Sequence, residues 1–98
     1  MWSLVDNDIV VGRVPEISRF YGIVIAMFFN EHAKPHFHAR YGDFKITIEI
    51  ESGLVTGTFP AGQRRMVLEW AELHRAELLE NWDRARRHES LESVAPLE

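Results

Sequence analysis

Alternating side chains on either side of Gly42 constrain the fold more than any other feature of this chain. Between residues 36 and 50, apolar residues occupy every second position before and after a Tyr-Gly-Asp-Phe segment. The intervening positions before the turn are His36, His38 and Arg40. Glycine adopts the positive φ that a two-residue hairpin turn requires, and side chains alternate between the two faces of a strand. The sequence therefore predicts a β-hairpin with one apolar face and one face that carries two imidazoles and a guanidinium.

The two-residue turn also fixes the register of this hairpin. It pairs Tyr41 with Phe44, Ala39 with Ile46 and Phe37 with Ile48 on the apolar face, and Arg40 with Lys45, His38 with Thr47 and His36 with Glu49 on the other. A slip by one residue would move every apolar side chain to the polar face. The agreement between turn and alternation therefore favours this register.

Further segments extend the hairpin into a sheet. Residues 15–20 are expected to be extended, and the apolar run at residues 21–29 predicts a strand covered on both faces. A second two-residue turn at residues 51–54 predicts a last strand, with Val55 opposite Ile50. The expected sheet is a four-stranded antiparallel meander.

Helix is predicted from about Gln63 to His88, because apolar residues recur there at helical spacing. The apolar stripe changes direction midway, so we expect a break or bend near His74 and Arg75. An irregular tail begins at Glu89. The fold class is therefore α+β, with the sheet followed by a C-terminal helix or broken helix pair packed on one face. The residues expected to be buried include Phe37, Ala39, Tyr41, Ile46, Ile48, Val55, Phe59, Trp70 and Trp82.

Composition excludes several classes of protein. The chain has 98 residues and a formal net charge of −4, which fits one domain and argues against a nucleic-acid-binding polycation. It has no cysteine, which excludes disulfides and thiolate metal sites. No apolar run reaches the roughly 18 residues that a membrane span requires. We therefore expect a cytoplasmic protein that does not enter a membrane.

Three segments, residues 15–25, 31–42 and 68–82, resemble a small bacterial family called domain of unknown function 4160. The resemblance covers residues 15–97, and its most specific part is Glu-His-x-x-Pro-His-Phe-His-Ala-Arg-Tyr-Gly at residues 31–42. The family has no established activity. Its genes often lie beside another small gene, an arrangement interpreted as a toxin–antitoxin pair. The resemblance therefore implies a small partner protein from a neighbouring gene.

The resemblance also bears on the first residues of the chain. Family members usually begin with methionine directly before the Pro-Glu-Ile-Ser-Arg-Phe segment, and Val14 stands at that position here. The resemblance thus implies that the natural protein begins at position 14. Residues 1–13 would then be a poorly ordered N-terminal extension, and residues 14–98 would form a single α+β domain.

One hypothesis for the histidine segment is a metal site. His32, His36 and His38 can supply three neutral nitrogens, with Glu31 or Glu49 as an oxygen ligand. This donor set suits zinc or another divalent first-row metal. The two strand histidines can converge on one ion only if His32 folds back from its loop.

A second hypothesis is RNA binding or metal-independent RNA cleavage. Such a reaction needs a general base, a general acid and a cation that stabilises the phosphate. Histidine titrates near neutral pH, so His36 and His38 suit the first two roles, and Arg40 suits the third. Lys45 would also contact phosphate, and Glu49 would orient His36.

A third hypothesis is a protein-interaction module. The polar face of the hairpin, or an edge strand of the sheet, would bind a partner protein. The histidines would then be hydrogen-bonding groups, with His36 paired to Glu49 and His38 to Thr47. The sequence leaves open whether the chain is an enzyme.

Overall fold

The structure is a computed structural model that describes residues 15–98. Its elements are β1 (Glu16–Phe20), β2 (Ile23–Ala26), β3 (His36–Tyr41), β4 (Phe44–Glu49), β5 (Val55–Thr58), α2 (Ala61–Leu73) and α3 (Arg75–Arg86). The predicted α+β class is confirmed. The expectations for residues 1–13, including the natural start at position 14, lie outside the described residues.

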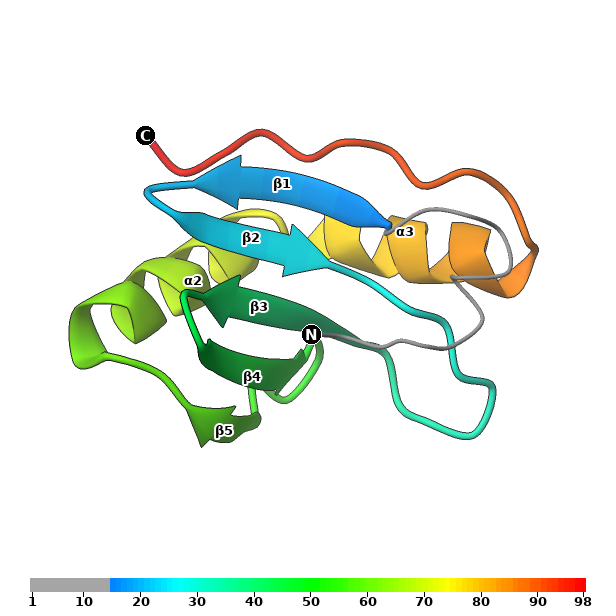
Figure 1. Cartoon of the computed structure of the whole chain (residues 1–98). Coiled ribbons are helices and arrows are strands. Elements are labelled where there is room, and N and C mark those ends of the chain that lie inside the picture. Colours follow the sequence, from blue (N-terminus) through cyan, green and yellow to red (C-terminus); the bar gives the residue numbers. More distant parts are fainter. Residues whose placement is uncertain (1–14) are drawn as a thin grey trace.

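The sheet has five antiparallel strands in the order β1-β2-β3-β4-β5, so the prediction of four strands is wrong (Figure 1). The additional strand is β1, which pairs with β2 across a tight turn at Tyr21 and Gly22. Both turn residues have positive φ, 49° for Tyr21 and 81° for Gly22. A tyrosine in this conformation is uncommon. A register shift between Glu16 and Ser18 also interrupts the alternation by which a strand is recognised in sequence.

The register of the β3–β4 hairpin is the predicted one, from Tyr41 opposite Phe44 to His36 opposite Glu49. The β4–β5 register is shifted by two residues from the prediction, since Val55 lies opposite Ile48 and not opposite Ile50. The connection is longer than a two-residue turn, and the Glu49 N–H donates to the Leu54 carbonyl at 3.0 Å. Because the shift is even, every side chain keeps its expected face.

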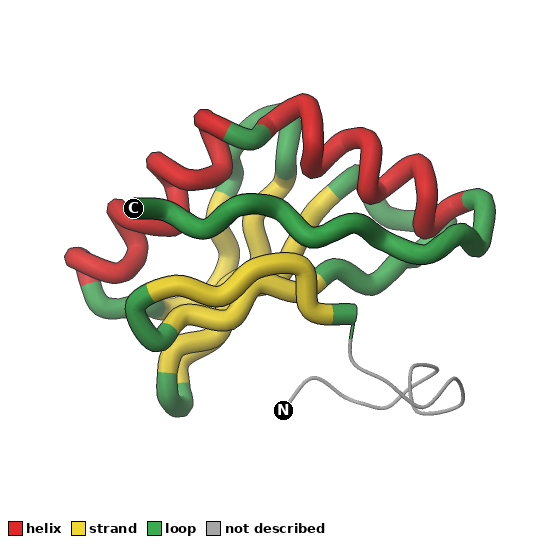
Figure 2. The backbone as a smooth tube through the Cα atoms, turned by 90° about the horizontal axis from the view of Figure 1, so that it is seen from above, coloured by secondary structure: helices red, strands yellow, loops and turns green. Residues whose placement is uncertain are grey.

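Both helices cover the same face of the sheet (Figures 1 and 2). The predicted break is present, since α2 ends at Leu73, His74 interrupts the helix and α3 begins at Arg75. Trp70 of α2 is fully buried, and its ring lies 5.5 Å from that of Phe20 and 5.7 Å from that of Phe37. Of the residues predicted to be buried, Tyr41 and Val55 are partly exposed and the others are buried.

The last residues follow an irregular path, as predicted, but they pack against the domain. In both views of the backbone they run beside β1, at the edge of the sheet (Figures 1 and 2). The Val94 N–H donates to the Ile17 carbonyl at 2.8 Å, and the Val94 side chain is buried. Within residues 15–98, no helix is long and apolar enough to cross a membrane.

Candidate functional site

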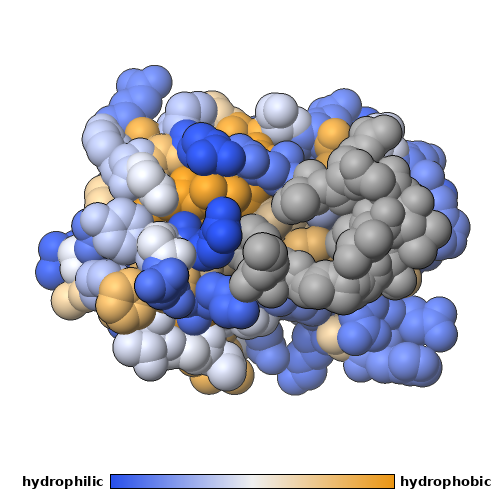
Figure 3. Space-filling view, viewed as in Figure 1, coloured by the Kyte–Doolittle hydropathy of each residue, from blue (hydrophilic) through white to orange (hydrophobic). Residues whose placement is uncertain are grey.

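The predicted polar face of the hairpin is the face of the sheet opposite the helices. Phe37 and Ala39 point into the core, so strand alternation places His36, His38 and Arg40 on the other side. The coloured part of this face in the space-filling view shows mostly hydrophilic side chains around a smaller apolar area (Figure 3). The structure therefore brings the two strand histidines and Arg40 onto one surface.

His38 is the most perturbed of these side chains. Burial is the main cause that lowers the pKa of its imidazole to about 4, and electrostatic interactions with His36 and Lys45 contribute less. Its ring packs edge-on against Phe28, with 5.1 Å between ring centroids. Its Nδ1 lies 3.5 Å from the Thr47 hydroxyl, which agrees with the predicted pairing of His38 with Thr47. At pH 7 the ring is neutral, so it can accept or donate a hydrogen bond but cannot act as a general acid.

His36 is held by the loop before it. Its Nδ1–H donates to the Lys34 carbonyl at 2.8 Å, which leaves the lone pair on Nε2. The predicted hydrogen bond from His36 to Glu49 is absent within the described chain: the His36 Nδ1–H donates to the Lys34 carbonyl, and the Glu49 carboxylate accepts from the Ser52 hydroxyl at 2.7 Å. The two side chains remain cross-strand neighbours. Glu49 therefore does not orient the imidazole.

The rings of His36 and His38 lie 5.2 Å apart, and that of His36 lies 5.1 Å from Trp82 on α3. Trp82 also contacts Phe29, at 5.2 Å. The histidine pair is thus part of a row of tilted and edge-on rings at one end of β3. This packing restricts how far His36 can turn toward a ligand.

Arg40 lies further along β3, opposite Lys45 on β4 and Val24 on β2. A hydrogen bond from Arg19 is the main cause of the lowered pKa of Glu16, and the charge of Arg40 adds to it. The electrostatics of this end of the face therefore combine several cations with a carboxylate.

His32 is separate from the pair. Its side chain is 85% exposed, and its Nε2 lies 3.4 Å from the Glu31 carboxylate. Within residues 15–98, no group of three or more His, Asp or Glu side chains is placed to hold a metal ion. The described part of the chain thus gives no support to a zinc site at His32, His36 and His38.

Beside His36 the surface is hollowed. A shallow groove of about 220 Å³, here called the histidine groove, is lined by Ala33, Lys34, His36, Thr47, Glu49, Leu54 and Thr56. A second hollow of about 200 Å³ shares Lys34 and Glu49 with it. The sequence hypotheses missed Lys34, Leu54 and Thr56 as site residues. The sequence carried no clear signal for these residues, since the 58% exposure of Leu54 is evident only from the fold.

Comparison with known proteins gives one match. Residues 22–83, more than half of the chain, match the family described as Domain of unknown function (DUF4160), and the match includes the histidine segment. No match was found among curated proteins or among solved structures. The chain therefore belongs to the DUF4160 family.

Proposed function

We propose that this chain is a protein-interaction module, part of a toxin–antitoxin-like pair encoded by two neighbouring genes, and that it binds an extended segment of its partner at β5. The observation that carries the proposal is the position of the histidine groove beside the terminal strand of the sheet. A partner strand added to a sheet edge gains affinity from main-chain hydrogen bonds and specificity from a side-chain pocket.

The ladder between β4 and β5 indicates which groups of β5 point outward. The Glu49 N–H donates to the Leu54 carbonyl, which places Glu49 and Leu54 at a hydrogen-bonded position of the ladder, although the Glu49 carbonyl accepts from the Gly53 N–H. Hydrogen-bonded and non-hydrogen-bonded pairs alternate along an antiparallel ladder. Val55 and Gly57 occupy the non-hydrogen-bonded positions, opposite Ile48 and Ile46. Their N–H and C=O groups therefore point away from β4, where a partner strand can pair with them.

The histidine groove lies next to this edge and has mixed chemistry. Leu54 offers an exposed apolar contact at the start of β5. Lys34 and Glu49 supply opposite charges, while His36 presents the lone pair of Nε2 as an acceptor. A partner side chain with an apolar body and a polar end fits such a lining.

Binding is better supported than catalysis. His38 is neutral at pH 7, since burial lowers its pKa to about 4, and its ring packs against Phe28. The acid–base pair that RNA cleavage requires would therefore lack its acid at His38. The imidazole of His36 is oriented by the Lys34 carbonyl and not by Glu49, so the carboxylate–histidine pair of the RNA-cleavage hypothesis is not formed.

A matched pair of arginine substitutions tests the proposal. Thr56 lines the groove, whereas Thr58 lies two residues further along β5 on the same face and outside the groove. We expect Thr56→Arg to weaken binding of the neighbouring gene's product at least ten-fold in isothermal titration calorimetry. Thr58→Arg should weaken it less than two-fold.

Two results would replace the proposal. Equal affinities for both variants would place the partner elsewhere on the protein. If no complex forms, and the chain cleaves a mixed RNA pool in a manner lost in both His36→Ala and His38→Ala, the function is RNA cleavage.

A further inference from the structure

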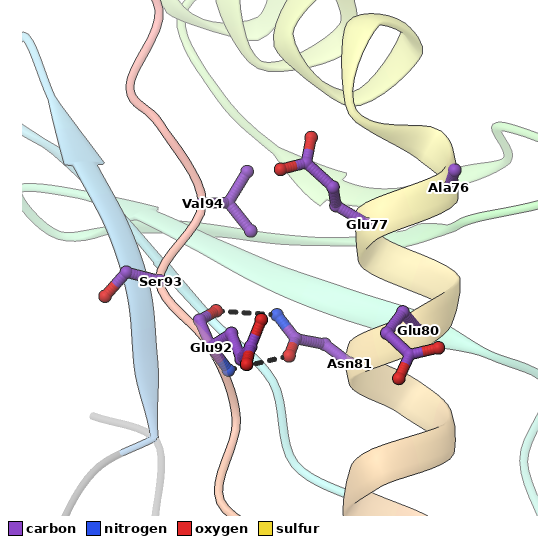
Figure 4. Close-up of a pocket in the computed structure, with 7 residues that line it drawn as sticks. All are labelled: Ala76, Glu77, Glu80, Asn81, Glu92, Ser93 and Val94. Carbon is purple, nitrogen blue, oxygen red and sulfur yellow. Dashed lines mark hydrogen bonds between the residues drawn. The ribbon is translucent and has the colours of Figure 1, made fainter.

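Residues 89–98 lie between β1 and α3 in the manner of a bound peptide, with hydrogen bonds to both elements, and the place that they occupy is here called the β1–α3 groove. The carboxamide of Asn81, on α3, donates to the Glu92 carbonyl at 2.9 Å and accepts from the Glu92 N–H at 2.8 Å (Figure 4). Asn81 is only 2% exposed, so without these two bonds a buried amide would lack partners. Asparagine is also a poor residue for a helix interior. Its presence here is explained by the main chain that it binds.

The groove also contacts the main chain of the same segment further along. The Val94 N–H donates to the Ile17 carbonyl of β1 at 2.8 Å. The indole Nε1–H of Trp70 donates to the Ala95 carbonyl at 2.8 Å. All four of these hydrogen bonds involve backbone groups of the segment and none of its side chains. Recognition of this kind tolerates different sequences.

Side chains of the segment contact the domain at every third position. Val94 is buried, Leu91 and Leu97 pack against the core, and the residues between them are exposed. A polyproline II helix turns once every three residues, so an extended segment of this kind directs positions i, i+3 and i+6 to one side. The groove thus selects spacing and apolar character at three positions.

The segment does not fill the groove. A hollow of about 180 Å³ remains between α3 and residues 92–94, with Glu77 on the helix side (Figure 4). Nearby, the Glu92 carboxylate pairs with Arg84 at 3.0 Å. A peptide with a bulkier residue at the hollow would contact the groove over a larger area than residues 89–98 do.

We propose that the β1–α3 groove is a peptide-binding site, which residues 89–98 occupy within the same molecule. Its ligand is an extended segment of a partner protein that carries large apolar residues at every third position. The seated segment shows which backbone and side-chain contacts such a ligand makes, and the hollow provides room for tighter contact. This site lies at the edge of the sheet opposite to β5, and the inference does not depend on the proposed function there.

The test uses the full chain and a fluorescein-labelled peptide with the sequence of residues 89–98. In the wild-type chain the tethered segment competes at an effective concentration in the millimolar range. Val94→Asp places a carboxylate in the buried position and releases the segment. We expect the labelled peptide to bind Val94→Asp at least ten-fold more tightly than wild type, as measured by fluorescence anisotropy. The Trp70 indole proton, followed by NMR, should move when the segment is released and return when the peptide binds.

Three controls sharpen this test. A peptide with aspartate at position 94 should not bind, and adding Asn81→Ala to the Val94→Asp chain should abolish binding. Adding the exposed change Arg86→Ala instead should leave binding intact. Should Val94→Asp lower the melting temperature, excess wild-type peptide should restore it, and the milder Leu97→Ser serves as a second releasing variant.

Two outcomes would overturn the proposal. In one, the peptide neither binds nor restores either released variant, so the segment is simply part of the folded core. In the other, the wild-type chain forms a concentration-dependent dimer that added peptide does not dissociate, so the groove exchanges segments only with a second copy.

Discussion

Mild acidification, between pH 7 and pH 5, should destabilise this fold, and His38 should be the main cause. Burial lowers the pKa of His38 from 6.5 to about 4 in the folded protein. Between these values the unfolded chain binds more protons than the folded protein does, so the free energy of unfolding rises with pH. The stability that a neutral His38 provides is therefore complete above pH 6.5, and it is lost as the pH falls toward 4. Ion pairs with arginine lower the pKa values of Glu16, Asp83 and Glu89. These carboxylates therefore stop contributing to the free energy of unfolding at a lower pH than His38 does.

The magnitude follows from the two pKa values of His38. At about 1.4 kcal/mol for each pKa unit, proton binding to the unfolded chain lowers the free energy of unfolding by about 2 kcal/mol between pH 7 and pH 5. The ring is only half-buried, and solvent screening reduces this effect. We therefore expect a loss of about 1–2 kcal/mol.

Urea unfolding at pH 7 and pH 5 measures this difference. His38→Gln should remove about 1–2 kcal/mol of the loss, because the substituted side chain does not titrate. His32→Gln is the matched control, since its side chain is 85% exposed and its surroundings change little on unfolding. The reasoning is refuted if His38→Gln retains the full pH dependence, or if NMR titration of the folded protein places the pKa of His38 near 6.5.

Four further outcomes are expected. Trp70→Ala should lower the free energy of unfolding by about 3–5 kcal/mol in urea, because it leaves a cavity at a fully buried position; a loss below about 1 kcal/mol would contradict this. Gly57→Ala should cost at least about 2 kcal/mol, since the added Cβ would lie 2.5 Å from the Lys45 carbonyl oxygen at a φ of +112°. Gly53→Ala, at a φ of +78° with open space around it, should cost about 1 kcal/mol by the same assay. Equimolar zinc should leave the histidine NMR signals of residues 32–38 unmoved, and a shift of all three would restore the metal hypothesis.

The parts of the fold that sequence reasoning predicted correctly are those in which local signals agree. At the β3–β4 hairpin, the turn chemistry of Gly42 and the alternation on both sides specify one register, and the structure has that register. The helix break at His74 could be predicted because the apolar stripe changes direction there. β1 was missed because its turn begins with Tyr21 in a conformation that sequence does not signal. The β4–β5 register was missed because the loop after Glu49 is longer than the shortest turn.

For the candidate site, sequence reasoning predicted the shared face but not the contacts. Strand alternation alone places His36 and His38 together. The group that holds His36 is the Lys34 carbonyl, and its position depends on how the loop before β3 folds back. Strand alternation does not predict this loop. The packing of the last residues against the domain could not be predicted either. Their apolar residues recur every third position, which matches neither a strand nor a helix. Its key partner, Asn81, looked like an ordinary polar helix residue.

The two edge strands of the sheet, β1 and β5, have different surroundings, and the two proposed binding sites are therefore far apart. Residues 89–98 cover β1, whereas β5 is the terminal strand beside the histidine groove. Adjacent strands lie about 4.8 Å apart, so the two edges are separated by roughly 19 Å. Substitutions at that distance with no shared partners have additive effects within about 0.5 kcal/mol. If both sites bind as proposed, Thr56→Arg should leave peptide binding at the β1–α3 groove unchanged, and Asn81→Ala should leave partner binding at β5 unchanged. A double variant with non-additive effects would mean that one partner spans both edges, and the two proposals would then describe a single interface.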